Sequence, residues 1–216
     1  TRAAAESSIV LLGVKPQLMQ GVTAALKPVV QRHKPLIISV AAGVTTQSLN
    51  EWLGGNLAIV RCMPNTPALV QLGASALYAN TQVSQAQKDL AQQVIANTGI
   101  ALWVDTQAQL DIVTALSGSG PAYFFMLMES MIDAAVSQGL PVQIAEQLTL
   151  QTAAGAAAMA QQSKTAPAHL RKQVTSPKGT TEQAIVSFEK SGFAAIIKKG
   201  MQANIDRSKQ LAIELA

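Results

Sequence analysis

The chain has 216 residues, enough for one large or two small domains, and its 16 basic and 12 acidic side chains give a formal charge of +4. These charges are scattered, so no polybasic run of the kind that binds nucleic acid occurs, and the single cysteine excludes an intrachain disulfide framework and fits a reducing cytoplasm. Only 13% of the residues are charged, about half the fraction usual for soluble proteins, which indicates large surfaces that are buried or covered by another subunit.

No targeting or metal-binding pattern is present. The sequence lacks a run of about 18 uninterrupted apolar residues, and its N-terminus lacks a basic stretch followed by an apolar one. We therefore expect neither a membrane span nor secretion, and predict a cytoplasmic protein. His33 and His169 are far apart in sequence, with no cysteine or carboxylate at ligand spacing, so we predict no metal site.

The first half of the chain alternates between apolar strands and helices. An alternation of this kind predicts an α/β fold with a parallel sheet and crossover helices. The predicted strands are Ile9–Val14, Leu36–Val40, Leu57–Arg61, Ala74–Ala79 and Ala101–Val104, and the predicted helices span about 17–31, Thr46–Trp52 and about 84–98.

Three of these strands are followed by short loops at their carboxyl ends. Ligands of open parallel sheets bind outside those ends, so the loops are expected to line one rim. They are Val14-Lys15-Pro16, Ala41-Ala42-Gly43 and the stretch from Met63 to Pro67.

Beyond Asp105 the apolar period becomes helical, which places a domain boundary between residues 1–105 and 106–216. Phe124, Leu127 and Met131 recur at helical spacing and are interpreted as core, while the alanine-rich run 153–158 is interpreted as a close-packing helix face. The predicted helices run from Pro121 to the stop signal at Gly139, and then over 142–162, 167–174, 181–190 and 193–213.

The segment 174–184, with the sequence VTSPKGTTEQA, brings two threonines to a predicted helix start. Unpaired N–H groups and the helix dipole allow such a site to hold a carboxylate without a neighbouring cation. The alternative is an ordinary threonine N-cap.

Four segments, GVKP at 13–16, RCMPNTPA at 61–68, ALSGSGPAYFF at 115–125 and the loop 174–184, together resemble pyrroline-5-carboxylate reductase. This resemblance implies an incomplete Rossmann domain followed by an all-helical domain that forms an intertwined homodimer. It also implies an oxidoreductase that reduces the cyclic imino acid 1-pyrroline-5-carboxylate to L-proline with NADPH or NADH, the last step of proline biosynthesis.

The resemblance also implies site residues. Thr181 is expected to donate a hydrogen bond to the imine nitrogen. Asn65 between two prolines is also a good turn residue, Lys15 can be merely solvated, and Cys62 is interpreted as a buried small apolar residue. The implied substrate contacts are Ser176, Gly179, Thr180 and Thr181, and the implied cofactor contacts are Val14, Lys15, Pro16, Ala41, Ala42, Asn65, Thr66 and Gln173.

Two departures from the family pattern matter. Lys178-Gly179 stands where the family usually has Gly-Gly, so a positive φ at Lys178 would cost about 1 kcal/mol or more. The family opens with a glycine-rich phosphate loop that this sequence lacks, so the chain alone is expected to show little activity. The alternatives are an inactive truncated helical dimer, and a related two-domain hydroxy-acid dehydrogenase whose acid–base lysine has no strong candidate here.

Overall fold

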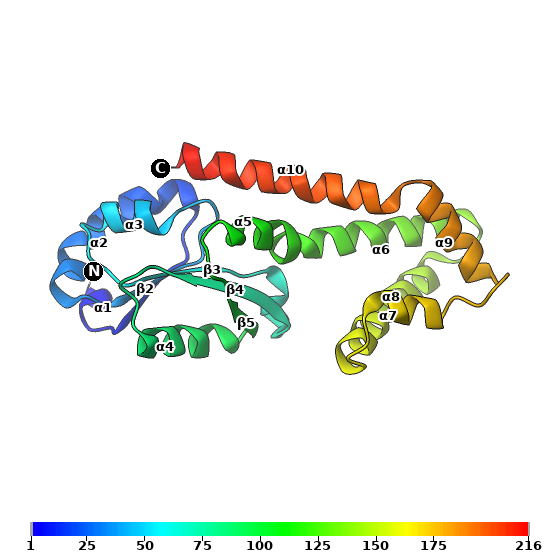
Figure 1. The fold of residues 1–216 in the computed structure, drawn as a ribbon, viewed down its shortest axis with the longest axis horizontal. Helices are drawn as coiled ribbons and strands as arrows, with labels where there is room; N and C mark the ends of the chain where they lie inside the picture. The colour runs from blue at the N-terminus through cyan, green and yellow to red at the C-terminus, as the bar shows by residue number, and fades with distance from the viewer. Residues whose placement is uncertain (1, 216) are drawn as a thin grey trace. The chain divides into compact units, whose positions relative to one another are not determined.

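A computed structural model describes residues 2–215 of the chain (Figure 1). These residues form two compact units. The first contains the residues up to Pro121 together with those from Met201 onward, and the second is Ala122–Gly200. The change to helical periodicity after Asp105 therefore precedes the point at which the packing divides, after Pro121.

The first unit is built on a five-stranded sheet in the order β1-β2-β3-β4-β5. All neighbouring pairs are parallel except β3 and β4, so the α/β class is confirmed but the expected parallel continuation is wrong at that pair. Only residues 64–72 join β3 to β4, too few for the crossover that parallel strands need. The strands are β1 (Ile9–Leu12), β2 (Leu36–Ser39), β3 (Ile59–Met63), β4 (Gly73–Ala79) and β5 (Gly99–Trp103).

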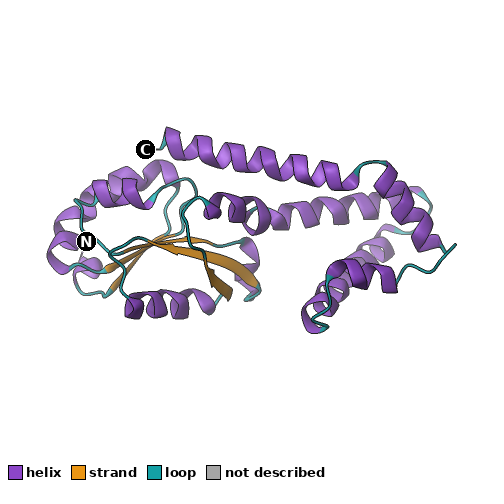
Figure 2. Cartoon of the chain, in the orientation of Figure 1, coloured by secondary structure: helices purple, strands orange, loops and turns teal. Residues whose placement is uncertain are grey.

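Helices cover both faces of this sheet (Figure 2). Successive strand residues point to opposite faces, so Ile37 and Ile59 join the core beneath the helices α2 and α3, while Ile38 and Val60 join the core beneath α4. The helices of this layer are α2 (Met19–His33), α3 (Thr46–Trp52) and α4 (Gln85–Ala96), with short turns α1 (Arg2–Ala5), η1 (Pro16–Leu18) and η2 (Thr66–Val70) that the sequence did not predict.

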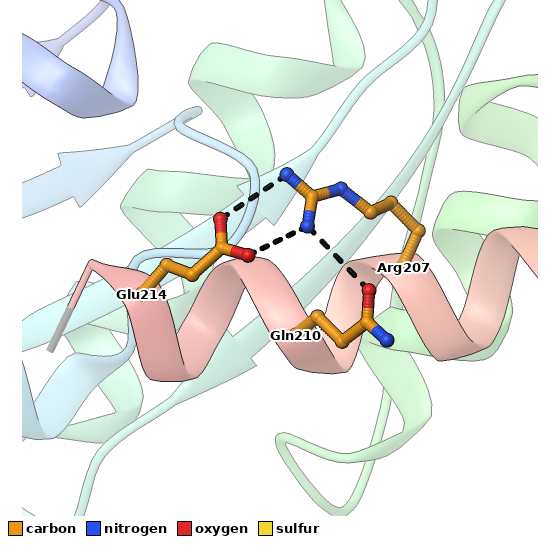
Figure 3. Close-up of polar contacts among 3 residues, drawn as sticks. All are labelled: Arg207, Gln210 and Glu214. Atoms are coloured by element: carbon orange, nitrogen blue, oxygen red, sulfur yellow. Dashed lines mark hydrogen bonds and ion pairs between the residues drawn. The ribbon is translucent and has the colours of Figure 1, made fainter.

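The first unit also includes α5 (Gln109–Val113), the π-turn η3 (Thr114–Gly118) and the end of α10 (Phe193–Glu214). Ser208 donates a hydrogen bond of 2.7 Å to Asp111, which joins α10 to α5. Near the end of α10 the Arg207 guanidinium binds both carboxylate oxygens of Glu214, at 2.7 and 3.1 Å (Figure 3). Residues beyond Asp105, from α5, the π-turn and the end of α10, therefore belong to the same compact unit as the sheet.

The second unit is helical, with helices close to those predicted. The interpretation of its apolar face as core is wrong within one chain, because Phe124 is 64% exposed, Leu127 45% and Met131 44%. In residues 122–200 only Ala145 and Thr149 are buried. A single copy therefore gives this unit almost no core. Its helices are α6 (Gly120–Ser137, which begins in the first unit), α7 (Val142–Gln162), α8 (Pro167–Gln173), α9 (Thr180–Lys190) and the first part of α10.

One helical stretch among residues 2–215, Gln109–Ser137, is long and apolar enough to cross a membrane by length and composition. Apolar helices that pack against other helices in soluble proteins pass the same criterion. Here the stretch contains the π-turn and the exposed face of α6 described above.

Candidate functional site

The carboxyl ends of β1, β2 and β3 lie side by side, because the three strands are parallel neighbours. The loops that follow them are thus at the same edge of the sheet, as the strand alternation predicts. Val14 and Pro16 are half-buried, Ala41 is buried and the Lys15 side chain is exposed. The rim is accordingly formed mainly by backbone and small side chains.

An open hollow of about 410 Å³ lies at this edge. Its lining is largely apolar and comes from the β3–β4 connection and from the π-turn. A Cβ atom on Gly118 would lie 2.5 Å from Cε of Met63, so a larger residue there would require the end of the Met63 side chain to move. The lining residues are Pro64, Asn65, Thr66, Ala68, Leu69 and Gly118.

The side-chain amide of Asn65 makes two hydrogen bonds to backbone atoms. Its Oδ1 accepts a hydrogen bond of 2.9 Å from the N–H of Ala74, and its Nδ2 donates one of 3.0 Å to the carbonyl of Ser117. Thr66 is exposed, and none of the side-chain hydrogen bonds among residues 2–215 uses its hydroxyl.

The loop after β2 is supported from α10. Gly43 has φ +76°, and a Cβ there would lie 3.2 Å from Cβ of Leu211 and 3.4 Å from Cδ1 of Leu215. A side chain at Gly43 would be both strained and crowded. The N–H of Ala41 donates to Oγ of Ser39 at 3.3 Å.

Two polar side chains are buried on β3, directly before the hollow. Burial lowers the pKa of Arg61, against the opposing effects of Asp111 and Tyr78. Burial raises the pKa of Cys62 to about 11, although a hydrogen bond with Ser75 acts in the other direction. Cys62 is 3% exposed and a neutral thiol at physiological pH, as expected of a small apolar residue.

The threonine loop lies in the second unit. Lys178 has φ +60°, so the strain expected at this position is present. Gly179, with φ −84°, is the N-cap of α9 and makes no side-chain cap, so the alternative of a threonine N-cap is wrong. Thr180 and Thr181 are the first two residues of that helix.

Hydrogen bonds within this loop already occupy some of the backbone N–H groups that could bind a carboxylate. The N–H of Gly179 donates to the carbonyl of Ser176 at 3.0 Å, and that of Lys178 donates to Oε2 of Glu182 at 2.8 Å. Among the described residues the N–H groups of Thr180 and Thr181 make no such bond outside the helix. The N–H groups of Thr180 and Thr181 are therefore not occupied by another acceptor among residues 2–215.

The remaining expected residues are on the surface of the second unit. Gln173 ends α8 and is exposed, as are the Ser176 and Thr181 side chains. Arg171, on the same helix, donates a hydrogen bond of 2.9 Å to Glu189.

Sequence reasoning did not single out Ser117 or Gly118. Both lie in the run SGSG at 117–120, whose paired glycines are a signal of close backbone approach that was available in the sequence. The π-turn itself was not predictable from the sequence, because no pattern of apolar spacing marks it.

The sheet of the first unit and the loops at the carboxyl ends of its parallel strands place the protein in the Rossmann-type class of folds, whose ligands bind at that edge. The sequence profile for pyrroline-5-carboxylate reductase dimerisation matches residues 107–211. A pyrroline-5-carboxylate reductase of Pseudomonas aeruginosa is 54% identical over 99% of this chain and 78% of its own length, and one of Glycine max is 38% identical over 96% and 74%. The chain belongs to the pyrroline-5-carboxylate reductase family.

Solved structures agree with this assignment. The reductase of Coxiella burnetii superposes with a TM-score of 0.93 at 43% identity, covering 98% of this chain and 78% of that one. The Plasmodium falciparum enzyme, solved with NADP bound, has a TM-score of 0.89 at 32% identity, covering 98% and 79%. An archaeal ketol-acid reductoisomerase, 13% identical with a TM-score of 0.58, shares the fold.

Proposed function

We propose that this protein reduces 1-pyrroline-5-carboxylate to L-proline with NADPH or NADH, the last step of proline biosynthesis. The observation that carries the proposal is the 54% identity to the Pseudomonas aeruginosa reductase over 99% of the chain, which includes both the rim and the threonine loop.

The residues at the rim fit a nicotinamide cofactor. The hollow is open, about 410 Å³ in volume and mostly apolar in its lining, which suits the flat face of a nicotinamide ring. When bound, the cofactor supplies the hydride that reduces the imine carbon. The residues proposed to hold it are Val14, Lys15, Pro16, Ala41, Ala42, Asn65 and Thr66, with Gln173 near the nicotinamide.

The threonine loop is proposed to bind the substrate. The N–H groups of Thr180 and Thr181, at the positive end of α9, hold the carboxylate, and the turn from Ser176 to Gly179 shapes the loop. The Thr181 hydroxyl donates a hydrogen bond to the ring nitrogen, which favours the more electrophilic imine. A threonine is too weak an acid to deliver the proton itself, so solvent supplies it.

The proposed boundary between the two functional domains is the change to helical periodicity after Asp105. Residues 1–105 form the cofactor-binding domain, and residues 106–216 form the substrate-binding and dimerisation domain of a cytoplasmic homodimer. The family profile over residues 107–211 and the exposed apolar face of α6 support this division.

The experiment uses the full-length encoded protein, purified and checked for folding by circular dichroism. It is mixed with NADPH and 1-pyrroline-5-carboxylate, with L-proline quantified alongside the loss of NADPH absorbance. We expect equal amounts of NADPH consumed and L-proline formed. A folded protein that consumes no cofactor with this substrate contradicts the proposal.

A further inference from the structure

We propose that Asn65 is a positioning residue, whose side-chain amide fixes the distance between the two walls of the hollow. This inference rests on the proposed function in one respect, namely that the hollow receives the nicotinamide end of the cofactor. The contacts that carry it are all within the first unit.

The two hydrogen bonds of Asn65 join the loop after β3 to the start of β4, nine residues further on, and to the π-turn, 52 residues further on. Through Oδ1 the residue holds the start of β4 at Ala74, and through Nδ2 it holds the π-turn at Ser117. An asparagine provides an acceptor and a donor at this short reach, whereas an aspartate provides acceptors only. Replacement by aspartate is therefore expected to keep the first bond and lose the second.

Within its own helical stretch the π-turn is held by hydrogen bonds from the Thr114 and Ser117 hydroxyls to preceding carbonyls. Its own closure is the bond of 2.8 Å from the N–H of Ser119 to the carbonyl of Thr114. On the side of α10, Nδ2 of Asn204 donates to Oγ of Ser119 at 2.9 Å. Among the hydrogen bonds of residues 2–215, the one from Asn65 to Ser117 joins the turn to the β3–β4 connection. Gly118, the next residue of that turn, lines the hollow.

Asn80 provides a matched control. Its Oδ1 accepts a hydrogen bond of 3.1 Å from the N–H of Ile59, and its Nδ2 donates one of 2.9 Å to the carbonyl of Leu57. Both asparagines are half-buried and bond backbone atoms through both ends of the amide. Asn80 follows β4 and bonds residues at the beginning of β3, whereas Asn65 lies beyond the end of β3. A general loss of stability affects both pairs of variants, whereas a loss of positioning at the hollow affects only the variants of Asn65.

The experiment compares Asn65→Ala and Asn65→Asp with Asn80→Ala and Asn80→Asp in the full-length encoded protein. Three quantities are measured for each: the thermal midpoint, amide hydrogen exchange over peptides covering 63–74 and 114–120, and the dissociation constant of NADPH by fluorescence titration. We expect all four variants to lower the midpoint. Only those of Asn65 are expected to speed exchange in 114–120 and weaken NADPH binding, by roughly 10-fold for one lost hydrogen bond.

In steady-state kinetics the Asn65 variants are expected to raise the KM for NADPH and leave that for 1-pyrroline-5-carboxylate near the wild-type value. Unchanged NADPH affinity in Asn65→Asp, or an equal loss in the Asn80 variants, overturns the inference. If Asn65→Ala does not fold, Asn65→Asp carries the same comparison. A wild-type protein that binds NADPH without turning over the substrate contradicts the proposed function, while the exchange and binding data still decide the role of Asn65.

Discussion

At the scale of single residues, Thr181 combines a backbone donor and a hydroxyl at the start of α9. Thr181→Ala removes the hydroxyl and leaves the N–H groups, so carboxylate binding is expected to survive largely. A hydrogen bond made mainly in the transition state lowers kcat and kcat/KM together, by about 10-fold to 100-fold. Steady-state kinetics of the full-length encoded protein measures both constants.

Thr181→Ser is the control for this prediction. It retains the hydroxyl and removes only the methyl group, so most of the activity should remain. A rise in KM alone in the alanine variant would instead make Thr181 a binding residue.

Lys178 is the second residue whose effect can be predicted. Its φ of +60° is a conformation that glycine adopts without a Cβ penalty, so Lys178→Gly should raise the thermal midpoint. The gain is at most about 1 kcal/mol, because glycine also increases the entropy of the unfolded chain. Lys178→Ala keeps the Cβ while removing the charge, and equal stabilisation by both variants would show that charge rather than backbone strain is responsible.

At the scale of elements, the last turns of α10 carry the ion pair of Figure 3. Hydrogen bonding from Arg207 lowers the pKa of Glu214. The pair therefore contributes to stability at pH values above the ordinary glutamate range, and this contribution is lost as the pH falls through the lowered pKa. Both side chains are about half exposed, so the effect on stability should be small and reduced by salt.

The measurement is an NMR titration of the Glu214 carboxyl group in the wild type and in Arg207→Gln. We expect the pKa to rise toward its ordinary value in the variant. Identical titration curves in the two proteins would show that the pair does not persist in solution.

At the scale of the whole molecule, the second unit requires apolar partners that one copy does not provide. The exposed side chains of α6 and the family profile over 107–211 lead us to expect a dimer or a multiple of it in sedimentation velocity at micromolar concentration. A monomer at that concentration would contradict the prediction.

A substitution at Gly155 tests whether this part of α7 lies in the interface between subunits. Nothing within the chain lies within 4 Å of the position that its Cβ would take. Gly155→Leu therefore has room in a single copy, but it should weaken association by about 1–3 kcal/mol if another subunit packs closely there. Dissociation measured by dilution distinguishes the two situations. An unchanged association constant would place the interface elsewhere.

The sequence by itself determined the elements and the order of the motifs. Apolar runs and helical spacing depend on local geometry, so strands such as Leu36–Ser39 and helices such as Val142–Gln162 were predicted almost to the residue. The parallel pairing of the first strands and the rim at their carboxyl ends followed from the same alternation. The strain at Lys178 was expected from the family resemblance, because the family usually has a glycine at that position, and the φ of +60° confirms it.

Only the tertiary structure decided which segments meet. The antiparallel turn to β4, the bond from Asn65 to Ser117 and the packing of Leu211 on Gly43 join residues that no local pattern relates. The apolar face of α6 was interpreted as core because periodicity shows that a face is apolar and not what covers it. The exposure of this face in one chain shows that no other part of the same copy covers it, as is typical of a surface that binds another subunit.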